Sequence, residues 1–425
     1  MAVNASAYWR IRIGGADTNG GGFDPAIVGA GTDYTEQDTP QLTVTDLAAT
    51  GAVTTLTSAT GGFTSAMVGN AISISGGTGW TTEARYFITA VPNSNTIVID
   101  RAASAGAASG GTCRVGGALA TVYLPTSSYA VAGNAVYVRG QGSNNPVDID
   151  YYTNTQVNGG TSHLSYIGYN GRPKISHRGE LWWQQNYHTW ENFYFIQSVG
   201  TTTEKGVLAN NAYGAGCMAY NCVFDSGGFD ATLVSDVGCI QCTFQNTGTQ
   251  TAGTKFAFVA DGAFCGISIP FINNLVKDQR GGGISVFDNR VIVIGNIVQN
   301  CLGDGIYVEA GGTTQNVGIT MQNTIYNCGG DGLSVADSHH KAYANLITNI
   351  TGSGKFGVKV RDSVVRAGRD SKIRTSRNNI HGCTTAVNIS GSAQDLALNP
   401  AYANAPTDLT PTNTSLRFLG GVGAL

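Results

Sequence analysis

Charged side chains are scarce in this chain of 425 residues, at 12% of the total, which is about half of the usual share of roughly 25%. The chain has a net charge of −3, so it has no basic excess of the kind found in nucleic-acid-binding proteins or polybasic membrane-surface proteins. Glu, Lys and Leu are too few for long amphipathic helices. These shortages disfavour a helical fold and predict no nucleic-acid partner.

Long apolar runs are missing as well. No stretch of about 18 apolar residues occurs, so the sequence predicts no membrane-spanning helix. The segment from Met1 to Gly15 lacks the basic region and following apolar stretch of a secretory signal. We therefore expect synthesis in the cytoplasm without a signal peptide, and no insertion into a membrane.

Glycine, by contrast, is abundant, with 59 residues. Glycine supplies backbone angles that other residues avoid, and Thr, Val and Ile favour strands. The mixture is typical of many short strands joined by tight turns and predicts an all-β protein. The nine cysteines are an odd number and recur at equivalent repeat positions, which predicts buried thiols rather than a disulfide framework.

A repeat headed by asparagine occupies the C-terminal half of the chain. Two residues after each Asn comes an apolar residue, and five after it comes Cys or Ile, with Gln279 as the exception. A glycine turn and an alternating strand follow, such as Ile306 to Val308. We expect the residue between each apolar pair to face solvent. The repeat asparagines are Asn274, Asn296, Asn323, Asn345 and Asn378, and the predicted solvent-facing residues are Ser285, Tyr307, Ser334, Lys359 and Asn388.

A coil of roughly 22 residues with three short strands is one rung of a parallel β-helix. Rungs stack at the strand spacing of about 4.8 Å, so equivalent asparagines are expected to form a ladder of amide hydrogen bonds. A leucine-rich horseshoe would need an L-x-x-L-x-L pattern, which is absent. Weaker rungs extend upstream through Asn221 and Gln241.

The chain divides into four predicted segments. An initial strand and cap cover residues 1–34, and an inserted small β-module with a role in attachment covers 35–117. The parallel β-helix covers 118–397. Residues 398–425, with Pro400, Pro406 and Pro411, fit a C-terminal cap, because the open end of a solenoid exposes unpaired strand edges.

Three segments carry a family resemblance: Tyr8–Arg12 followed by Gly15–Gly22, Ala132–Val138, and Leu398–Tyr402 closing at Leu416–Phe418. With these, the chain resembles the pectate-lyase-like superfamily of right-handed parallel β-helix proteins. The resemblance implies the fold, which hosts lyases, hydrolases and inert structural proteins alike. The enzyme motifs Asn-Thr-Asp, Gly-His-Gly, Arg-Ile-Lys and Trp-Ile-Asp-His are absent.

The inserted module, with strands expected at 63–74, 86–91 and 96–99, resembles modules near the N-termini of bacteriophage virion proteins. That resemblance implies attachment to a virion, and a passive decoration of the helix end is the alternative. A structural solenoid of this kind is expected to be made in the host cytoplasm and to end up in the virion.

Asp304 and Asp331 both lie in Gly-Asp-Gly and are expected in adjacent rungs. With Glu309 they are the catalytic candidates, because two close carboxylates can divide acid and base roles or bind Ca²⁺. The alternative is a turn aspartate that accepts backbone hydrogen bonds. No cofactor is expected, and Ca²⁺ has no further support.

Other candidates concern binding. Tyr307, Asp337 and Lys359 lie on the strand face where the superfamily commonly places its substrates, and Trp182 and Trp183 begin an aromatic cluster that fits either a sugar platform or a core and subunit interface. His339 and His340 are expected in a solvated turn. A basic stretch fits either docking to an acidic partner or a solvated protrusion, and its candidates are Arg366, Arg369 and Arg374.

The leading hypothesis is a structural virion protein on the tail or capsid, a homotrimer that contacts other virion proteins and has a glycan-binding surface for host polysaccharide. The alternative is a polysaccharide-degrading lyase or glycoside hydrolase of the tailspike type. A flat apolar face along the helix would favour assembly. A carboxylate pair exposed in a groove would favour the enzyme.

Overall fold

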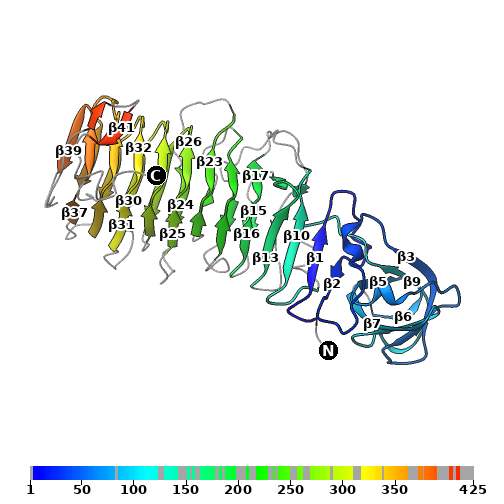
Figure 1. Ribbon diagram of the computed structural model, residues 1–425. Coiled ribbons are helices and arrows are strands. Elements are labelled where there is room, and N and C mark those ends of the chain that lie inside the picture. The colour runs from blue at the N-terminus through cyan, green and yellow to red at the C-terminus, as the bar shows by residue number, and fades with distance from the viewer. Residues whose placement is uncertain are drawn as a thin grey trace. The chain divides into compact units, whose positions relative to one another are not determined.

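The chain is an all-β protein (Figure 1). Its two short helical turns, η1 (Tyr34–Glu36) and η2 (Ser65–Met67), are 3-10 segments, and no helix among the described residues is long and apolar enough to cross a membrane. The computed structural model describes residues 3–81, 85–122, 129–141, 151–153, 156–157, 163–177, 181–183, 187–197, 207–209, 217–227, 233–234, 238–248, 256–261, 269–287, 291–309, 317–336, 339–361, 372–376, 378–389, 402–404 and 408–411.

The chain divides into two compact units, of which the first holds most of residues 1–193. In this unit β1 (Tyr8–Ile11) pairs in parallel with β10 (Ala135–Arg139), which pairs with β13 (Ser165–Tyr169) and then β16 (Thr189–Glu191). β2 (Gly22–Phe23) runs antiparallel on the other edge of β1. The fully buried Trp9 donates its indole N–H to Asn134 Oδ1 at 3.2 Å, which joins the initial strand to the first rung.

A small antiparallel sheet lies between β2 and β10 in the sequence. β3 pairs with both β4 and β9, so the strand order β3-β4-β8-β7-β5-β9 closes on itself around an apolar core. Closure removes the unpaired edges that invite aggregation. The predicted antiparallel module is confirmed. Its strands are β3 (Leu42–Ala49), β4 (Thr55–Thr57), β5 (Ala71–Ser75), β6 (Thr78–Trp80), β7 (Arg85–Asn93), β8 (Thr96–Ile99) and β9 (Ser104–Val115).

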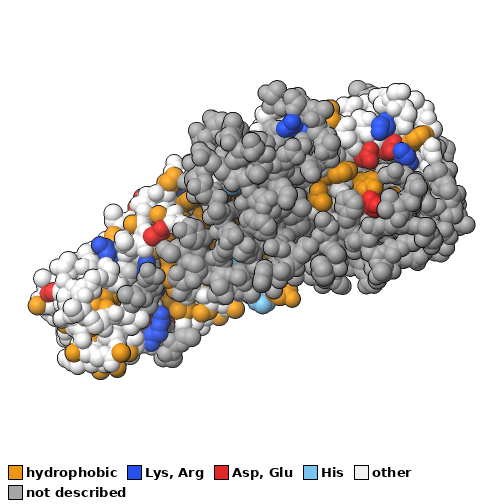
Figure 2. Space-filling view, turned by 180° about the vertical axis from the view of Figure 1, so that it is seen from behind, with side chains coloured by type: hydrophobic (Ala, Val, Ile, Leu, Met, Phe, Trp, Pro, Cys, Tyr) orange, Lys and Arg blue, Asp and Glu red, His pale blue; other side chains and the backbone are white. Residues whose placement is uncertain are grey.

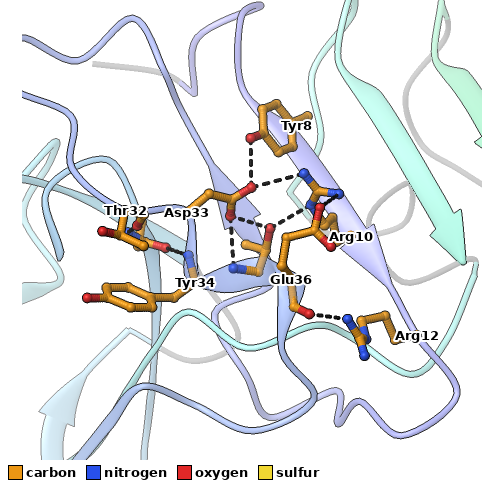
Figure 3. A network of polar contacts seen from close by, with 9 residues as sticks. Tyr8, Arg10, Arg12, Thr32, Asp33, Tyr34 and Glu36 are labelled. Carbon is orange, nitrogen blue, oxygen red and sulfur yellow. Dashed lines mark hydrogen bonds and ion pairs between the residues drawn. The ribbon is translucent and has the colours of Figure 1, made fainter. Parts of the chain in front are cut away.

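A polar cluster around Arg10 joins β1 to the segment that leads into this module (Figure 3). The Arg10 guanidinium bonds to Asp33 at 3.0 Å and also contacts the carboxylate of Glu36. Three tyrosine rings lie 5.3 to 5.5 Å from the same guanidinium, within cation–π range. A half-buried Arg is well suited to this position because its planar group bonds at its edge and stacks on its faces.

The second unit is a solenoid of three parallel sheets, seen as successive rungs in Figure 1. The right-handed parallel β-helix predicted from the repeat is confirmed. Sheet 1 contains β19 (Met218–Tyr220), β22 (Gly238–Ile240), β25 (Ile269–Ile272), β28 (Val291–Ile294), β31 (Val317–Met321), β34 (His339–Tyr343) and β37 (Lys372–Ser376). Sheet 2 contains β17 (Tyr194–Gln197), β20 (Val223–Asp225), β23 (Thr243–Gln245), β26 (Leu275–Lys277), β29 (Ile297–Gln299), β32 (Thr324–Tyr326), β35 (Leu346–Thr348) and β38 (Asn379–His381). Sheet 3 contains β15 (Leu181–Trp183), β18 (Val207–Ala209), β21 (Leu233–Val234), β24 (Phe256–Asp261), β27 (Gly282–Phe287), β30 (Ile306–Glu309), β33 (Leu333–Ala336), β36 (Phe356–Arg361) and β39 (Thr385–Ile389).

The remaining strands are short. They are β11 (Tyr151–Thr153), β12 (Gln156–Val157), β14 (Lys174–His177), and the antiparallel pair β40 (Tyr402–Asn404) and β41 (Asp408–Pro411).

The repeat asparagines form a buried ladder between sheets 1 and 2. Asn296 Nδ2 donates to Asn323 Oδ1 at 2.9 Å, and the same oxygen accepts the backbone N–H of Asn296 at 2.9 Å. The second N–H of the Asn296 amide donates to the carbonyl of Phe271. The pattern is the same from Asn274 to Asn378, so each bond within the ladder is matched by a bond to the backbone. These side chains are at most 2% exposed.

A second, exposed ladder runs along the next corner of the coil. Asn300 donates to Asp278, Asn327 to Asn300 and Asn349 to Asn327, at 2.9 to 3.0 Å. All four residues have φ between 53° and 56°. Asn and Asp tolerate this left-handed conformation better than other non-glycine residues, so here they serve both the turn and the stacking.

The interior is filled by stacked apolar side chains. Phe195, Phe224 and Phe244 stack in consecutive rungs with ring centroids 5.3 and 4.9 Å apart. None of the eight described cysteines forms a disulfide bond, and seven of them are buried, as predicted. Within the described residues, the core is therefore packed without disulfide bonds.

Two of the predicted solvent-facing residues are buried instead. Ser285 is 0% and Ser334 2% exposed. Tyr307 lies beside both in the strand register, with Lys359 on the far side of Ser334. In a parallel stack, large side chains in one rung cover small ones in the next, so alternation alone did not predict exposure correctly.

The buried ladder gives the first prediction. Asn323→Ala removes two acceptor and two donor bonds in the interior and should lower the free energy of unfolding by about 3–5 kcal/mol, because buried partners are left unsatisfied. Asn327→Gly, which keeps the positive φ of the exposed ladder, should cost under about 1 kcal/mol. Urea unfolding followed by circular dichroism measures both. Equal effects of the two variants would contradict a special role for the buried ladder.

Candidate functional site

The outward surface of sheet 3 holds most of the described candidates. The rings of Phe256 in β24 and Tyr307 in β30 lie 6.0 Å apart and nearly parallel, at 29°. Tyr307 Oη donates to the Glu309 carboxylate on the same strand, which fixes the tyrosine ring. Two nearly parallel aromatic rings beside an acidic group form a surface on which a sugar ring can stack.

Asp304 and Asp331 lie in consecutive turns and both bond to the backbone. Asp304 Oδ1 accepts the N–H of Asp331 at 2.7 Å, and Asp331 Oδ1 accepts the N–H of Phe356 at 2.9 Å. Each carboxylate thereby joins its own rung to the next. The arrangement matches the turn alternative considered from the sequence, with a carboxylate that accepts backbone hydrogen bonds.

Charge and burial distinguish these two carboxylates. Burial raises the pKa of the Asp304 carboxyl, and the hydrogen bond from the Asp331 N–H opposes that rise. Asp331 Oδ2 lies 3.4 Å from Lys359 Nζ. The same ammonium lies 5.5 Å from the Phe356 ring centroid. Figure 2 shows acidic, basic and hydrophobic side chains gathered on the C-terminal part of the solenoid.

Several candidates cannot be placed in this surface. Asp337, Arg366 and Arg369 lie outside the described residues. Trp182 and Trp183 in β15 and Arg374 in β37 have described backbones only. Among the residues that the structure describes, no group of three or more His, Cys, Asp and Glu side chains is arranged to hold a metal ion.

The aromatic cluster that follows Trp183 divides between core and surface. Trp190, Phe193 and Phe195 are at most 1% exposed. Tyr187 is 50% exposed and stacks on His163 with ring centroids 4.6 Å apart. The described part of this cluster therefore belongs mainly to the core.

The expectation of a solvated turn at His339 and His340 is wrong. Both lie in β34, and His340 is 3% exposed. Its Nε2 lies 3.1 Å from Thr320 Oγ1, one rung away in the interior. Burial lowers the pKa of His340 to about 4. The imidazole is therefore a neutral core side chain.

Sheet 1 holds a surface that the repeat did not reveal. Ala219, Cys239, Phe271, Val293, Thr320 and Ala342 point inward and are buried. The residues between them face outward in two rows aligned by the strand register. The outward face consists of Met218, Tyr220, Gly238, Ile240, Pro270, Ile272, Ile292, Ile294, Ile319, Met321, Lys341 and Tyr343, and we call it the apolar face.

The apolar face contains a single charged side chain, Lys341, within its six described strands. At about 4.8 Å per strand, it extends for roughly 25 Å along the solenoid. Soluble monomers rarely expose contiguous apolar patches larger than a few hundred square ångströms, and larger patches mark interaction sites. The sequence signal was the unbroken run Val291–Ile294, since strands covered on both faces lack alternation.

No protein-family model and no curated protein sequence matches the chain. Nine chains of known structure match it in fold, and they include pectate-lyase-like right-handed β-helix proteins. The A-module of the mannuronan C-5 epimerase AlgE4 of Azotobacter vinelandii is 11% identical over 62% of this chain and 91% of that one, with a TM-score of 0.36.

Two further structures give a similar picture. Pectate lyase Pel9A is 12% identical over 68% of this chain and 76% of its own, with a TM-score of 0.37. The Dettilon tailspike protein is 12% identical over 62% of this chain and 60% of its own, with a TM-score of 0.32. These likenesses concern the fold, and the fold itself rests on the strand pairing described above.

The buried histidine gives a pH prediction. The unfolded chain binds a proton on His340 below its ordinary pKa of about 6.5, whereas the folded chain does not until about pH 4. Stability should therefore be highest above pH 6.5 and fall toward pH 4, by roughly 3 kcal/mol from this group. His340→Gln should lose that part of the pH dependence in urea unfolding at pH 7.5 and 4.5. An unchanged pH dependence would contradict it.

Proposed function

We propose that the protein is a structural, self-associating β-helix of a bacteriophage virion, in which three copies pack their apolar faces around a common axis. The apolar face of sheet 1 is the observation that carries the proposal. The solenoid core covers one side of this sheet, and the outward isoleucines, methionines and tyrosines have the composition of a sheet covered on the other side as well.

A second and third copy fit this face better than an unrelated partner does. The outward side chains repeat at the rung spacing of about 4.8 Å, and a partner of the same architecture has the same spacing. Side chains of equivalent rungs can then match along the whole row. Closed symmetry is also the usual form of soluble oligomers.

The size of the face is consistent with the centre of an interface. A strip about 25 Å long and two residues wide offers a few hundred square ångströms, whereas a standard interface buries about 800 Å² per partner. Around a three-fold axis each chain contacts two others. The polar margins would supply the rest, because interfaces combine an apolar centre with a polar rim.

The virion location is supported by the sequence. The closed antiparallel module follows the initial strand, and its sequence resembles N-terminal modules of virion proteins. A module of this kind suits docking to other virion proteins, while the solenoid supplies a rigid rod. We place the protein on the tail or capsid on this ground.

Self-association can be tested in solution. In sedimentation equilibrium the chain should have a mass of about three times 44.1 kDa. Ile292→Lys combined with Ile319→Lys places two charges side by side on the apolar face and should give a folded monomer. Leu302→Lys, which changes an apolar residue that is 51% exposed outside sheet 1, is the matched control and should remain trimeric. A wild-type monomer would contradict the proposal.

A specific observation also favours glycan binding on sheet 3. Tyr307 and Glu309 in β30 and Lys359 in β36 lie on the outward side of sheet 3, with one strand between them. The Phe256 ring stacks on Tyr307. Rings that stack and charges that hydrogen-bond hydroxyls are the two elements of sugar recognition. The carboxylates of Asp304 and Asp331 already accept hydrogen bonds from backbone N–H groups. This favours glycan binding over glycan cleavage at sheet 3.

Glycan binding at this surface gives a further prediction. Tyr307→Ala removes one stacking ring and the partner of Glu309, and should weaken binding of a bacterial surface polysaccharide by about tenfold. Tyr326→Ala in sheet 2, outside both the apolar face and the sheet 3 surface, is the control and should bind normally. Glycan-array binding followed by calorimetry measures the change. Release of reducing ends by the wild-type protein, lost in Asp304→Ala/Asp331→Ala, would show an enzyme instead.

A further inference from the structure

A cavity of about 290 Å³ lies in the first unit, where the chain leaves the parallel strands of the initial rungs. Arg12 follows β1, Arg139 ends β10, and Asn170 follows β13. Asp38 from the segment before β3 lines the same cavity. The cavity is remote in sequence from the apolar face and from the sheet 3 surface, and neither proposed function uses it.

Arg12 is held along one edge of its guanidinium. Its Nε donates to Asp38 Oδ1 at 2.6 Å. Its Nη1 donates to the carbonyl of Glu36, as Figure 3 shows. Within the described residues, Nη2 has no hydrogen-bond partner. The Arg12 side chain is only 15% exposed and is held by these two bonds, so its Nη2 group has a fixed position.

Arg139 is held in a similar way. With the Asn170 amide oriented so that its oxygen faces the arginine, Oδ1 accepts from Nε and Nη2 of Arg139 at 3.0 Å each. Among the residues that the structure describes, Nη1 has no partner. Two guanidinium groups therefore line one cavity, and each is fixed by other residues. Nη2 of Arg12 and Nη1 of Arg139 can still donate hydrogen bonds to a ligand.

The charges favour an anion. Arg12 and Arg139 are positive and Asp38 is the single negative group among the lining residues, and its Oδ1 is already bonded to Arg12. Guanidinium groups bind carboxylates with strong charge-assisted hydrogen bonds. The cavity thus fits one ligand carboxylate that accepts a hydrogen bond from Arg12 and another from Arg139.

The other lining residues favour a sugar as the carrier of that carboxylate. Ile13, 51% exposed, supplies an apolar contact for the C–H face of a ring. A volume of about 290 Å³ is at the lower end for a small-molecule site. It suits a single residue rather than a long chain.

We propose that this cavity is a binding site for the carboxylate of an acidic sugar, a hexuronate unit held between Arg12 and Arg139. The site is a binding site only, and no reaction is assigned to it. No residue that lines the cavity belongs to the apolar face, so sugar binding and self-association are tested with different variants.

The test compares four probes on the full-length protein by calorimetry and ligand-observed NMR: glucuronate, glucose, acetate and inorganic phosphate. Glucuronate should bind with a dissociation constant of about 1 mM or tighter, more tightly than the other three, and more weakly as salt is added. Arg139→Gln should weaken glucuronate binding by about tenfold or more, since it removes a charged donor. Arg114→Gln, which changes a partly exposed arginine bonded to Ser75 in the module, is the matched control and should bind like the wild type.

Each contrary outcome overturns a defined part of the proposal. Phosphate or acetate binding as tightly as glucuronate would overturn the sugar, and glucose binding as tightly would overturn the role of the carboxylate. Equal binding by Arg139→Gln and the wild type, with both folded by circular dichroism, would overturn the location. Absence of binding by all four probes would overturn the site, whereas the trimer measured by sedimentation would be unaffected.

Discussion

The buried asparagine ladder sets the height of the rungs from Asn274 to Asn378 in the second unit. Its members lie at intervals of 22, 27, 22 and 33 residues along the chain. The amide-to-amide distance nevertheless stays between 2.9 and 3.0 Å throughout. The length of a rung therefore varies without changing the stacking, because extra residues between Asn345 and Asn378 do not interrupt the ladder. Register is fixed at one corner, and the rest of each coil follows from that point.

Fixed register turns outward residues into continuous surfaces. Position by position, the three sheets share one kind of interior, with Val, Ile, Phe and Cys in stacked rows. Their outward rows differ: sheet 1 is apolar from Met218 to Tyr343 except for Lys341, whereas sheet 3 mixes Tyr307 and Lys359 with small serines. The interior specifies the fold, so the capacity to bind or assemble resides in the outward rows.

Periodic features of the sequence were predictable, and features that depend on neighbours across rungs were not. The asparagine repeat and the alternation of Ile306 and Val308 lie within one coil, so the sequence shows them directly. The burial of Ser285 depends on Tyr307, 22 residues away and one rung up. The apolar face was not predicted because its strands lack alternation. The arginine cavity was not predicted because Arg12 and Arg139 come together only after the first rung has formed.

Three aspartates show why acidic residues in the turns of this solenoid are poor guides to catalysis. Asp225 Oδ1 accepts the N–H of Thr247, Asp304 Oδ1 that of Asp331, and Asp331 Oδ1 that of Phe356, each in the following rung. A turn residue has no strand partner for its backbone N–H, and leaving such a donor unsatisfied in a buried position costs about 1–3 kcal/mol. A carboxylate one rung below satisfies it. The Gly-Asp-Gly pattern is thus explained by stacking, which leaves ligand recognition to side chains outside the turns, such as Tyr307 and Arg139.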